Sequence, residues 1–307
     1  MDKLINLSII VSVYNEEQCL QVFYDRLILF INKIDTEIIF VNDGSFDNSF
    51  NALKDIQSNN PNITIINLSR NFGHEAAMLA GIDNAHGDSI LCIDADLQHP
   101  PKIIPQLIEE AKNGADIVLA KRDVSKNDSY IINIFSRLFY YLINKLSSIK
   151  FEANVSDYFL ISKKLQYILK TEYRERSRFL RGFIQDIGFK KVIVRYDAQK
   201  RIHGESKYDF MSLIKLSFNA LIAFSKKPLY LGIYLGVVFG LFSFFVTIYS
   251  IVMRCTSQVP PGYTTLIVII SLLFSVHFFL LGIIGIYIGF LFDEQKKRPI
   301  YIIDKIL

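Results

Sequence analysis

Closely spaced cysteines are missing from this sequence, which has only three cysteines among 307 residues. Cys19, Cys92 and Cys255 form no C-x-x-C pair, so the spacing typical of a zinc site or a disulfide framework is absent. Such sparse use of cysteine fits a reducing compartment. The amino-terminal segment also lacks the pattern of a signal peptide, because its apolar run is only as long as a strand and acidic residues follow at once.

Charged residues are missing from two long segments near the carboxyl terminus, residues 229–253 and 264–292, which contain no Asp, Glu, Lys or Arg. Each segment exceeds the roughly 20 residues that an α-helix needs to cross a bilayer. The sequence therefore predicts two transmembrane helices rather than buried helices of a soluble domain. A transporter or lipid flippase is disfavoured, because those proteins place ionisable groups along a polar pathway inside the membrane.

Basic residues flank this apolar region on one side of the predicted membrane. Two lysines precede the first segment, three basic residues follow the second, and the linker between them carries a single basic residue. By the positive-inside rule, both ends of the chain lie in the cytoplasm. We therefore expect a multi-pass protein of the inner or plasma membrane with its amino-terminal domain in the cytoplasm.

A strong excess of charge is also missing, since the formal net charge is only +4. Composition therefore gives no indication of a nucleic acid partner. Basic residues near apolar segments instead suit an anionic membrane surface or a phosphate-rich substrate.

Up to about residue 125, short β-rich runs alternate with amphipathic stretches. Strands are predicted at residues 7–14, 37–42, 63–68, 89–93 and 117–120, and helices at about 17–33, 47–58, 74–85 and 102–112. This alternation is typical of an α/β domain whose mainly parallel sheet is covered by helices on both faces. Ligands of such sheets bind beyond the carboxyl ends of the strands.

Two further stretches, residues 129–148 and 209–224, carry Ile, Phe, Leu and Tyr at helical spacing together with basic residues. They fit core-facing helices of a soluble domain equally well on pattern alone. Their closeness to the predicted membrane segments favours amphipathic helices that lie in the membrane interface.

The strongest local signal is the segment Asp94-Ala95-Asp96-Leu97-Gln98 at the end of a hydrophobic strand. Two carboxylates at positions i and i+2 can approach one hard cation, and Mg²⁺ or Mn²⁺ can in turn bridge the phosphates of a nucleotide. A D-x-D pair alone is weak evidence, because solvated loops also contain it by chance.

Two more polar clusters follow predicted strands, at Tyr14-Asn15-Glu16 and at Asp43-Gly44-Ser45. Each acidic residue is also an ordinary cap for the helix that follows. Because the carboxyl ends of parallel strands share one rim of the sheet, the three clusters together predict a polar pocket.

These residues resemble a known family. The segments VSVYNEE, VNDGSFDNS, LSRNFGHEAAMLAGIDNAHGD and IDADLQHPP, in this order, are similar to glycosyltransferase family 2. The resemblance is greatest to its polyprenyl-phosphate branch, the dolichol-phosphate mannose synthases and bacterial bactoprenol glucosyltransferases. It continues through SDYFLISKK, RFLRGFIQDIGF, RIHGESKY and GYTTL to the end of the second apolar segment, and so covers nearly the whole chain.

The resemblance implies a GT-A, Rossmann-like catalytic domain over residues 1–208. A juxtamembrane helix at 209–228, two transmembrane helices within 229–292 and a cytoplasmic tail at 293–307 would follow. The implied reaction is inverting transfer of a hexose, glucose from UDP-glucose foremost, to polyprenyl (undecaprenyl) phosphate. GDP-mannose and UDP-linked amino sugars are the alternative donors, and relatives suggest a homotetramer.

The resemblance also implies roles for individual residues. The nucleotide sugar would be held by Tyr14, Asn15, Glu16, Asp43 and Asp94. The metal, Mg²⁺ or Mn²⁺, and the diphosphate would be held by Asp94, Asp96 and Gln98.

The acceptor is expected to be a lipid phosphate, for which Arg122, Arg137, Arg201 and Lys207 are candidate ligands. Each is an ordinary solvated cation when taken alone, and Arg201 and Lys207 gain most from their motif. Asp157 would lie beside the acceptor as a base or an orienting group. The predicted catalytic residues are thus Asp157, Arg201, Lys207 and Asp96.

The sequence departs from the family pattern at Ser12, where proline is usual, and at Ile286, where close relatives have glutamate. We expect Ser12 to alter rigidity more than chemistry, and the histidines His74 and His203 are assigned no role. A processive polysaccharide synthase is disfavoured, because the Q-x-x-R-W motif requires a tryptophan and the chain has none. A membrane scaffold with a degenerate nucleotide pocket is the non-enzymatic alternative.

Overall fold

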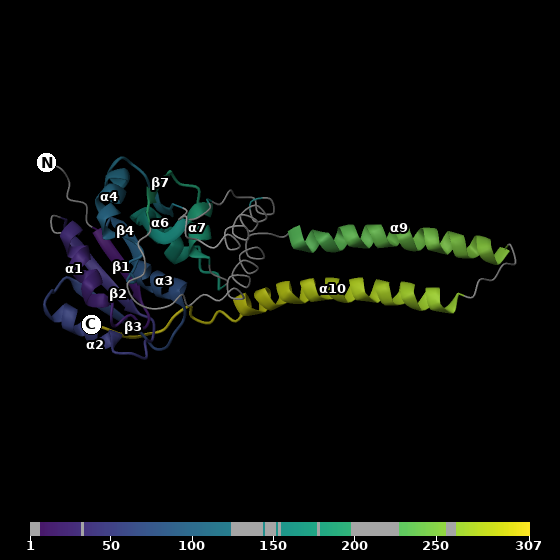
Figure 1. Cartoon of the computed structure of the whole chain (residues 1–307), viewed down its shortest axis with the longest axis horizontal. Helices are drawn as coiled ribbons and strands as arrows, with labels where there is room; N and C mark the ends of the chain where they lie inside the picture. The colour runs from purple at the N-terminus through teal and green to yellow at the C-terminus, as the bar shows by residue number, and fades with distance from the viewer. Residues whose placement is uncertain are drawn as a thin grey trace.

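The computed structural model describes residues 7–31, 34–123, 144, 152, 155–176, 179–197, 227–255 and 262–307. It consists of an α/β domain from which two long helices project (Figure 1). The predicted interfacial helices at 129–148 and 209–224 lie outside the described residues, apart from Asn144.

The centre of the sheet is parallel, as the alternation of strands and helices predicted. Four adjacent strands run in the order β3-β2-β1-β4. Their side chains are almost all buried, which explains why their sequences read as continuous apolar runs. The strands are β1 (Leu7–Val13), β2 (Thr36–Asn42), β3 (Ile63–Leu68) and β4 (Ser89–Asp94).

The outer part of the sheet adds two reversed strands, β6 and β8, to the predicted, mainly parallel sheet. Eight strands pair in the order β7-β5-β6-β4-β1-β2-β3-β8. The strand β6 runs antiparallel to both β4 and β5, and β8 runs antiparallel to β3. The sheet is therefore mixed, because an apolar run sets a strand but not the direction in which it pairs. These outer strands are β5 (Ile117–Arg122), β6 (Val155–Ser162), β7 (Lys191–Tyr196) and β8 (Ile303–Ile306).

Helices cover both faces of the sheet, as predicted. Alternating residues of β1 point to opposite sides, so Ile9 packs with α1, α2 and α4, whereas Ile10 packs with α3, α6 and α7. Both side chains are fully buried. The helices are α1 (Leu20–Ile31), α2 (Ser49–Ser58), α3 (His74–Asn84), α4 (Ile104–Lys112) with the preceding turn η1 (Pro101–Ile103), α6 (Lys163–Thr171) and α7 (Leu180–Asp186).

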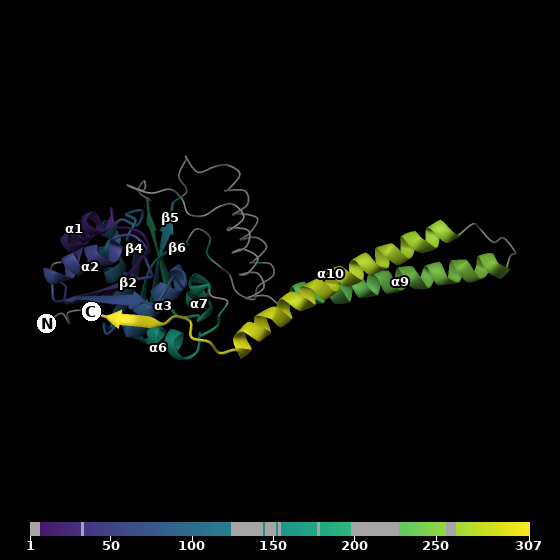
Figure 2. The same cartoon turned by 90° about the horizontal axis from the view of Figure 1, so that it is seen from below.

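The two predicted apolar segments are helical. Helix α9 (Lys227–Cys255) and helix α10 (Tyr263–Gln295) lie side by side and extend away from the α/β domain in both views (Figures 1 and 2). Within the described part of the chain, one segment, Leu272–Gln295 of α10, is long and apolar enough to cross a membrane. Its mean hydropathy is 2.2, and none of it is covered by the rest of the protein.

The chain returns to the α/β domain after α10, and its last residues form β8 on the edge of β3 (Figure 2). The backbone N–H groups of Ile65 and Leu307 each donate to the other residue's carbonyl, at 3.0 and 2.9 Å. This strand was not predicted, because residues 293–307 were expected only to form a cytoplasmic tail. The added strand covers an edge of the sheet that otherwise exposes unpaired backbone groups.

Helix α3 lies unusually close to the centre of the sheet because residue 81 is glycine. A Cβ atom at Gly81 would overlap with Cγ2 of Ile10 and lie 3.2 Å from Cγ2 of Val41. Both neighbours are fully buried side chains of β1 and β2. This close approach fixes the position of the amino terminus of α3, where His74 and Glu75 lie.

We expect Gly81→Ala to lower the free energy of unfolding by about 1–3 kcal/mol, the usual cost of overpacking a dense core. Thermal and denaturant unfolding of the detergent-solubilised full chain measures this loss. Ile10→Ala also destabilises, but the double variant should lose less than the sum, because the added methyl group then fills the vacated space. Full additivity would contradict the proposed close contact.

Candidate active site

A polar cluster lies where the carboxyl ends of β1 and β4 meet the beginning of β6. In the antiparallel ladder between β4 and β6, Cys92 pairs with Phe159 and Ser89 with Ser162. The same register, continued by two residues, places Asp94 opposite Asp157. The reversed direction of β6 therefore brings together two carboxylates that are 63 residues apart in the chain.

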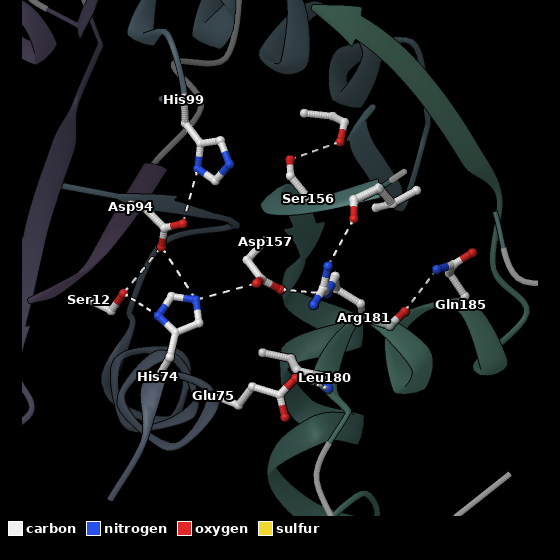
Figure 3. Close-up of polar contacts among 12 residues, drawn as sticks. Ser12, His74, Glu75, Asp94, His99, Ser156, Asp157, Leu180, Arg181 and Gln185 are labelled. Atoms are coloured by element: carbon white, nitrogen blue, oxygen red, sulfur yellow. Dashed lines mark hydrogen bonds and ion pairs between the residues drawn. The ribbon is translucent and has the colours of Figure 1, made fainter. Parts of the chain in front are cut away.

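His74, the first residue of α3, links these two carboxylates (Figure 3). Its Nε2 atom lies 3.4 Å from Oδ1 of Asp94 and 3.5 Å from Oδ2 of Asp157. Its Nδ1 atom lies 2.9 Å from Oγ of Ser12, and the Ser12 hydroxyl also lies 3.4 Å from Oδ1 of Asp94. Burial lowers the pKa of His74, but the charges of Asp94 and Asp157 and the hydrogen bond to Asp157 raise it to about 9.

This linkage was not predicted. His74 was assigned no role and Ser12 was expected to alter rigidity more than chemistry, whereas the structure places both side chains in the cluster. The contacts span 62 residues between Ser12 and His74 and 83 between His74 and Asp157. No local pattern in one sequence reports such contacts. The usable signal was that both residues stand in motifs that carry the family resemblance.

Asp157 is paired with a second cation, Arg181 of α7. The guanidinium Nε atom lies 3.0 Å from Oδ1 of Asp157. Burial raises the pKa of Asp157, but the charge of Arg181 and the contact with His74 together hold it well below its usual range. Asp157 is thus ionised at neutral pH. Arg181 was not among the predicted site residues, although it stands in the RFLRGFIQDIGF segment.

Glu75, the residue after His74 in α3, links α3 to α7. Its Oε1 atom accepts a hydrogen bond of 3.3 Å from the backbone N–H of Leu180. Burial and the nearby charge of Asp157 raise the pKa of Glu75 to about 7, against the opposing effect of Arg181 and His74.

The predicted metal-binding segment follows β4 directly. Asp94 has a second histidine beside it, because Nδ1 of His99 lies 3.4 Å from its Oδ2 atom. The His99 ring stacks on Tyr158, with 5.3 Å between the ring centroids. Oδ1 of Asp96 accepts a hydrogen bond of 3.0 Å from the backbone N–H of Gln98, which fixes the turn.

The donor set of Asp94, Asp96 and Gln98 consists of oxygen atoms on one short turn, which fits a hard divalent cation. Among the residues that the structure describes, no group of three or more His, Cys, Asp and Glu side chains is placed to hold a metal ion. A Mg²⁺ site needs no such group, because it uses one or two carboxylates and is completed by phosphate oxygens of the substrate.

The loop after β1 is held by the loop after β2. The backbone N–H of Asn15 donates to Oγ of Ser45 at 3.0 Å, and Oδ1 of Asn15 accepts from the Phe46 N–H at 2.9 Å. The N–H of Glu16 donates to Oγ of Ser49 at 2.9 Å. Asn15 adopts a positive φ of 54°, which this double contact stabilises. The Tyr14 ring meets Phe46 edge-on.

Asp43 was expected to contact the nucleoside, but in the structure it is buried and bonded to the protein backbone. It is 2% exposed, and its two oxygens accept hydrogen bonds from the backbone N–H groups of Phe72 and Gly73, at 2.7 and 2.9 Å. Next to it, Gly44 has a φ of 64°, and a Cβ atom there would lie 2.5 Å from the Arg70 carbonyl carbon. Asp43 thus fixes the loop that leads into His74.

The structure places one of the predicted acceptor cations at the rim. Arg122 is the last residue of β5 and pairs in register with Tyr196 of β7. Arg137, Arg201 and Lys207 lie outside the described residues. Of the predicted site, the structure therefore brings together Tyr14, Asn15, Glu16 and Asp43 on the β1–β2 side, and Asp94, Asp96, Gln98, Arg122 and Asp157 on the β4–β6 side.

Fold and site define a Rossmann-like α/β domain with a cluster of acidic side chains at the carboxyl rim of its sheet, the arrangement expected of the GT-A type. The sequence model of glycosyl transferase family 2 matches residues 8–168. The chain belongs to this family and is a glycosyltransferase.

Relatives match along nearly the whole chain. An uncharacterised glycosyltransferase of Bacillus subtilis, YkcC, is 37% identical over 99% of this chain and 95% of its own length. A bactoprenol glucosyl transferase of Shigella phage SfII is 36% identical over 97% of each chain. Among solved structures, glucosyl-3-phosphoglycerate synthase from Mycobacterium tuberculosis, in complex with Mn²⁺, UDP-glucose and phosphoglyceric acid, aligns with a TM-score of 0.48 at 14% identity. It covers 71% of this chain and 78% of the synthase.

The raised pKa of Glu75 predicts a pH-dependent stability. The folded state binds this proton more tightly than the unfolded state, whose glutamate pKa is about 4.3. Stability is therefore lost as the pH rises from about 4.3 to about 7. Glu75→Gln keeps an acceptor for the Leu180 N–H but carries no charge. We expect it to melt above the wild type at pH 8, with the difference shrinking toward pH 5.

Glu37→Gln is the matched control, with the opposite sign. Burial raises the pKa of Glu37, but hydrogen bonds from Ser8 and His86 lower it below the usual value. The folded state thus favours the ionised form, and Glu37→Gln should melt below the wild type at pH 8. A Glu75→Gln variant that gains nothing at pH 8 would show that ionising Glu75 costs the folded state nothing.

Proposed function

We propose that this protein transfers a hexose, with inversion, from a nucleotide sugar to polyprenyl (undecaprenyl) phosphate, and that UDP-glucose is the donor. The observation that carries the proposal is that His74 contacts both Asp94 and Asp157. Asp94 is the proposed metal ligand on the donor side, and Asp157 is the proposed residue on the acceptor side. The likeness to bactoprenol glucosyl transferases over the full chain supports the choice of a prenyl phosphate and of glucose.

The donor would lie along the rim between β1, β2 and β4. Tyr14, Asn15 and Glu16 would contact the nucleoside, and Asp43 would act by holding the neighbouring backbone in place. Asp94, Asp96 and Gln98 would hold Mg²⁺ or Mn²⁺ against the diphosphate. When bound, the metal neutralises the charge that builds up on the departing nucleotide.

The acceptor phosphate would enter beside Asp157. A phosphate monoester has a second pKa near 6, so its attacking oxygen is already largely anionic at neutral pH and needs positioning more than deprotonation. The lowered pKa of Asp157 makes it a poor base, since an effective one titrates near the working pH. We assign it an orienting role toward the acceptor or its cationic neighbours.

Cations around Asp157 would offset the charge of the incoming phosphate. Arg181 and His74 already neutralise the carboxylate, and Arg122 stands on the same rim. We propose Arg122, Arg137, Arg201 and Lys207 as direct phosphate ligands, because the planar donor fork of arginine and the charge of lysine both suit phosphate. Arg201 and Lys207 would act as catalytic residues by holding the nucleophile in line.

Both long helices would span the membrane, with the catalytic domain and the chain ends in the cytoplasm. The uncharged stretch 229–253 within α9, its length and its position beside α10 support a second span in addition to Leu272–Gln295. Interfacial helices at 129–148 and 209–224 would keep the pocket near the lipid headgroup, and the resemblance supports a homotetramer.

A donor screen on the purified full chain tests this function. The chain is incubated with Mn²⁺ or Mg²⁺, a short polyprenyl phosphate, and UDP-glucose, GDP-mannose or a UDP-linked amino sugar in turn. We expect a β-linked lipid-phosphate glucose from UDP-glucose. A mannosyl or amino-sugar product would change the donor, and the absence of metal-dependent turnover with every donor would favour a scaffold role.

The metal assignment makes a separate prediction about Asp96. Asp96→Ala should reduce turnover at least about a hundredfold, because metal stabilisation of the leaving group amounts to several kcal/mol. The variant should stay folded, with its melting temperature lowered only by the loss of the hydrogen bond from Gln98. Asp88→Ala is the control, since Asp88 precedes the same strand at its opposite end and is exposed. Turnover that survives both Asp96→Ala and EDTA would remove the metal from the mechanism.

The proposed topology predicts which parts of the chain are accessible from outside the cell. Tags at the amino and carboxyl termini should be protected in intact cells, whereas a tag inserted near residue 258 should be labelled. The reason is the basic flanks of the two apolar segments, which stay on the cytoplasmic side. The opposite labelling pattern would exclude a cytoplasmic nucleotide sugar as the donor.

A further inference from the structure

A continuous chain of hydrogen bonds runs from the carboxyl-terminal strand β8 to the loop after β1. Nδ2 of Asn67 donates to Oδ2 of Asp304 at 3.2 Å, and Nδ2 of Asn42 donates to Oδ1 of Asn67 at 2.7 Å. Oγ of Ser45 donates to Oδ1 of Asn42 at 2.6 Å, and Oγ of Ser45 accepts from the N–H of Asn15 at 3.0 Å. Three strands and two loops are thereby connected.

A bulge in β8 aims Asp304 at this chain. In the antiparallel ladder, Asn67 pairs with Lys305 and Leu68 pairs with Ile303, so the register shifts and Asp304 has no partner in it. An extra residue of this kind bends the strand and redirects a side chain. The bulge therefore turns the Asp304 carboxylate toward Asn67, in addition to allowing β8 to pair with the edge of the sheet.

The carboxylate sets the direction of every bond in the chain. An ionised Asp304 can only accept, so Asn67 must present its NH₂ group to it and its oxygen to Asn42. Asn42, which is 3% exposed, must then present its own NH₂ group to Asn67 and its oxygen to Ser45. That oxygen receives the Ser45 hydroxyl and faces the Ser45 backbone N–H at 3.4 Å. A reversed Asn42 amide would place NH₂ against that N–H.

We propose that Asp304 is a positioning residue for the nucleotide-sugar site. By fixing two amides and one hydroxyl, it holds Ser45 as the acceptor for Asn15 and so stabilises the left-handed conformation of Asn15. The inference rests on the proposed function, in which the loop of Tyr14, Asn15 and Glu16 contacts the nucleoside. It adds that the donor loop is ordered by the strand that follows the apolar helix α10.

The segment between α10 and β8 is itself anchored, so the position of Asp304 depends on the end of α10. The Tyr301 hydroxyl lies 2.5 Å from Oδ2 of Asp83, which also pairs with Arg174 at 2.9 Å. The backbone N–H of Arg176 donates to Oε1 of Glu294, in the last turn of α10, at 2.5 Å. The position of the end of α10 and the conformation of the loop after β1 are thus linked through the contacts of Glu294, Tyr301 and Asp304.

The test compares Asp304→Asn, which has the same shape but also donates, with Lys305→Gln on the same strand. Both are measured on the full chain in detergent. For Asp304→Asn we expect the Kd of UDP without lipid and the KM of UDP-glucose to rise roughly three- to tenfold, because a neutral amide replaces the charged acceptor and no longer fixes the direction of the hydrogen bonds. The KM of polyprenyl phosphate and kcat should change little, and Lys305→Gln should match the wild type.

Asn67→Ala tests whether Asp304 acts through the chain. Asn67→Ala should weaken UDP binding by a similar factor. The double variant, with both substitutions, should have a Kd for UDP no higher than the higher of the two single-variant values. Additive losses would overturn the relay. Equal losses on the donor and acceptor sides, with a lowered melting temperature, would also overturn it, because Asp304 would then serve the fold alone.

Amide hydrogen exchange without nucleotide separates this inference from the proposed function. Asp304→Asn should accelerate exchange in peptides covering residues 14–17 and 43–47, and leave those covering α4 unchanged. If exchange responds in this way while even the wild type binds no UDP, the proposed function fails and the positioning role stands. Unchanged exchange in these peptides, with wild-type UDP binding intact, refutes the positioning role.

Discussion

The reversed strand β6, inserted beside β4, is the constraint from which the site follows. A parallel neighbour in that place would present its carboxyl end at the rim, and Asp157, near the start of the strand, would lie at the opposite edge of the sheet. Because β6 is antiparallel, Asp157 faces Asp94 across one ladder, close enough for His74 to contact both. Two carboxylates that are 63 residues apart in the chain thus meet in one polar cluster.

Two neighbouring carboxylates repel each other unless positive charges lie close to them. Asp94 and Asp157 both lie beside His74, whose pKa is raised to about 9, and Asp157 also pairs with Arg181, so positive charge lies between the two carboxylates before any ligand arrives. Arg181 and His74 hold the pKa of Asp157 low although burial opposes its ionisation, whereas burial and the charge of Asp157 raise the pKa of Glu75 against the effect of the same two cations. An incoming phosphate then meets neutralised rather than bare carboxylates.

Distant parts of the chain hold this arrangement in place. Gly81 allows α3 to lie against β1 and β2, which sets the height of His74 above the rim. Asp43 ties the loop before α3 to β2 through two backbone N–H groups. The strand β8, returning from α10, closes the far edge of the sheet and is connected to the loop after β1 through Asn67, Asn42 and Ser45. The end of helix α10 and the rim of the sheet are therefore linked by a continuous set of contacts.

The sequence by itself determined the five leading strands and four helices, the two long apolar helices, the family, and the carboxylates that follow β1, β2 and β4, because these depend on local patterns and short motifs. The tertiary structure decided the direction of β6, the pairing of β8, and the placement of Ser12, His74, Arg181 and Asp304. Those contacts join residues that lie 24 to 242 positions apart, over which apolar periodicity and single motifs carry no information.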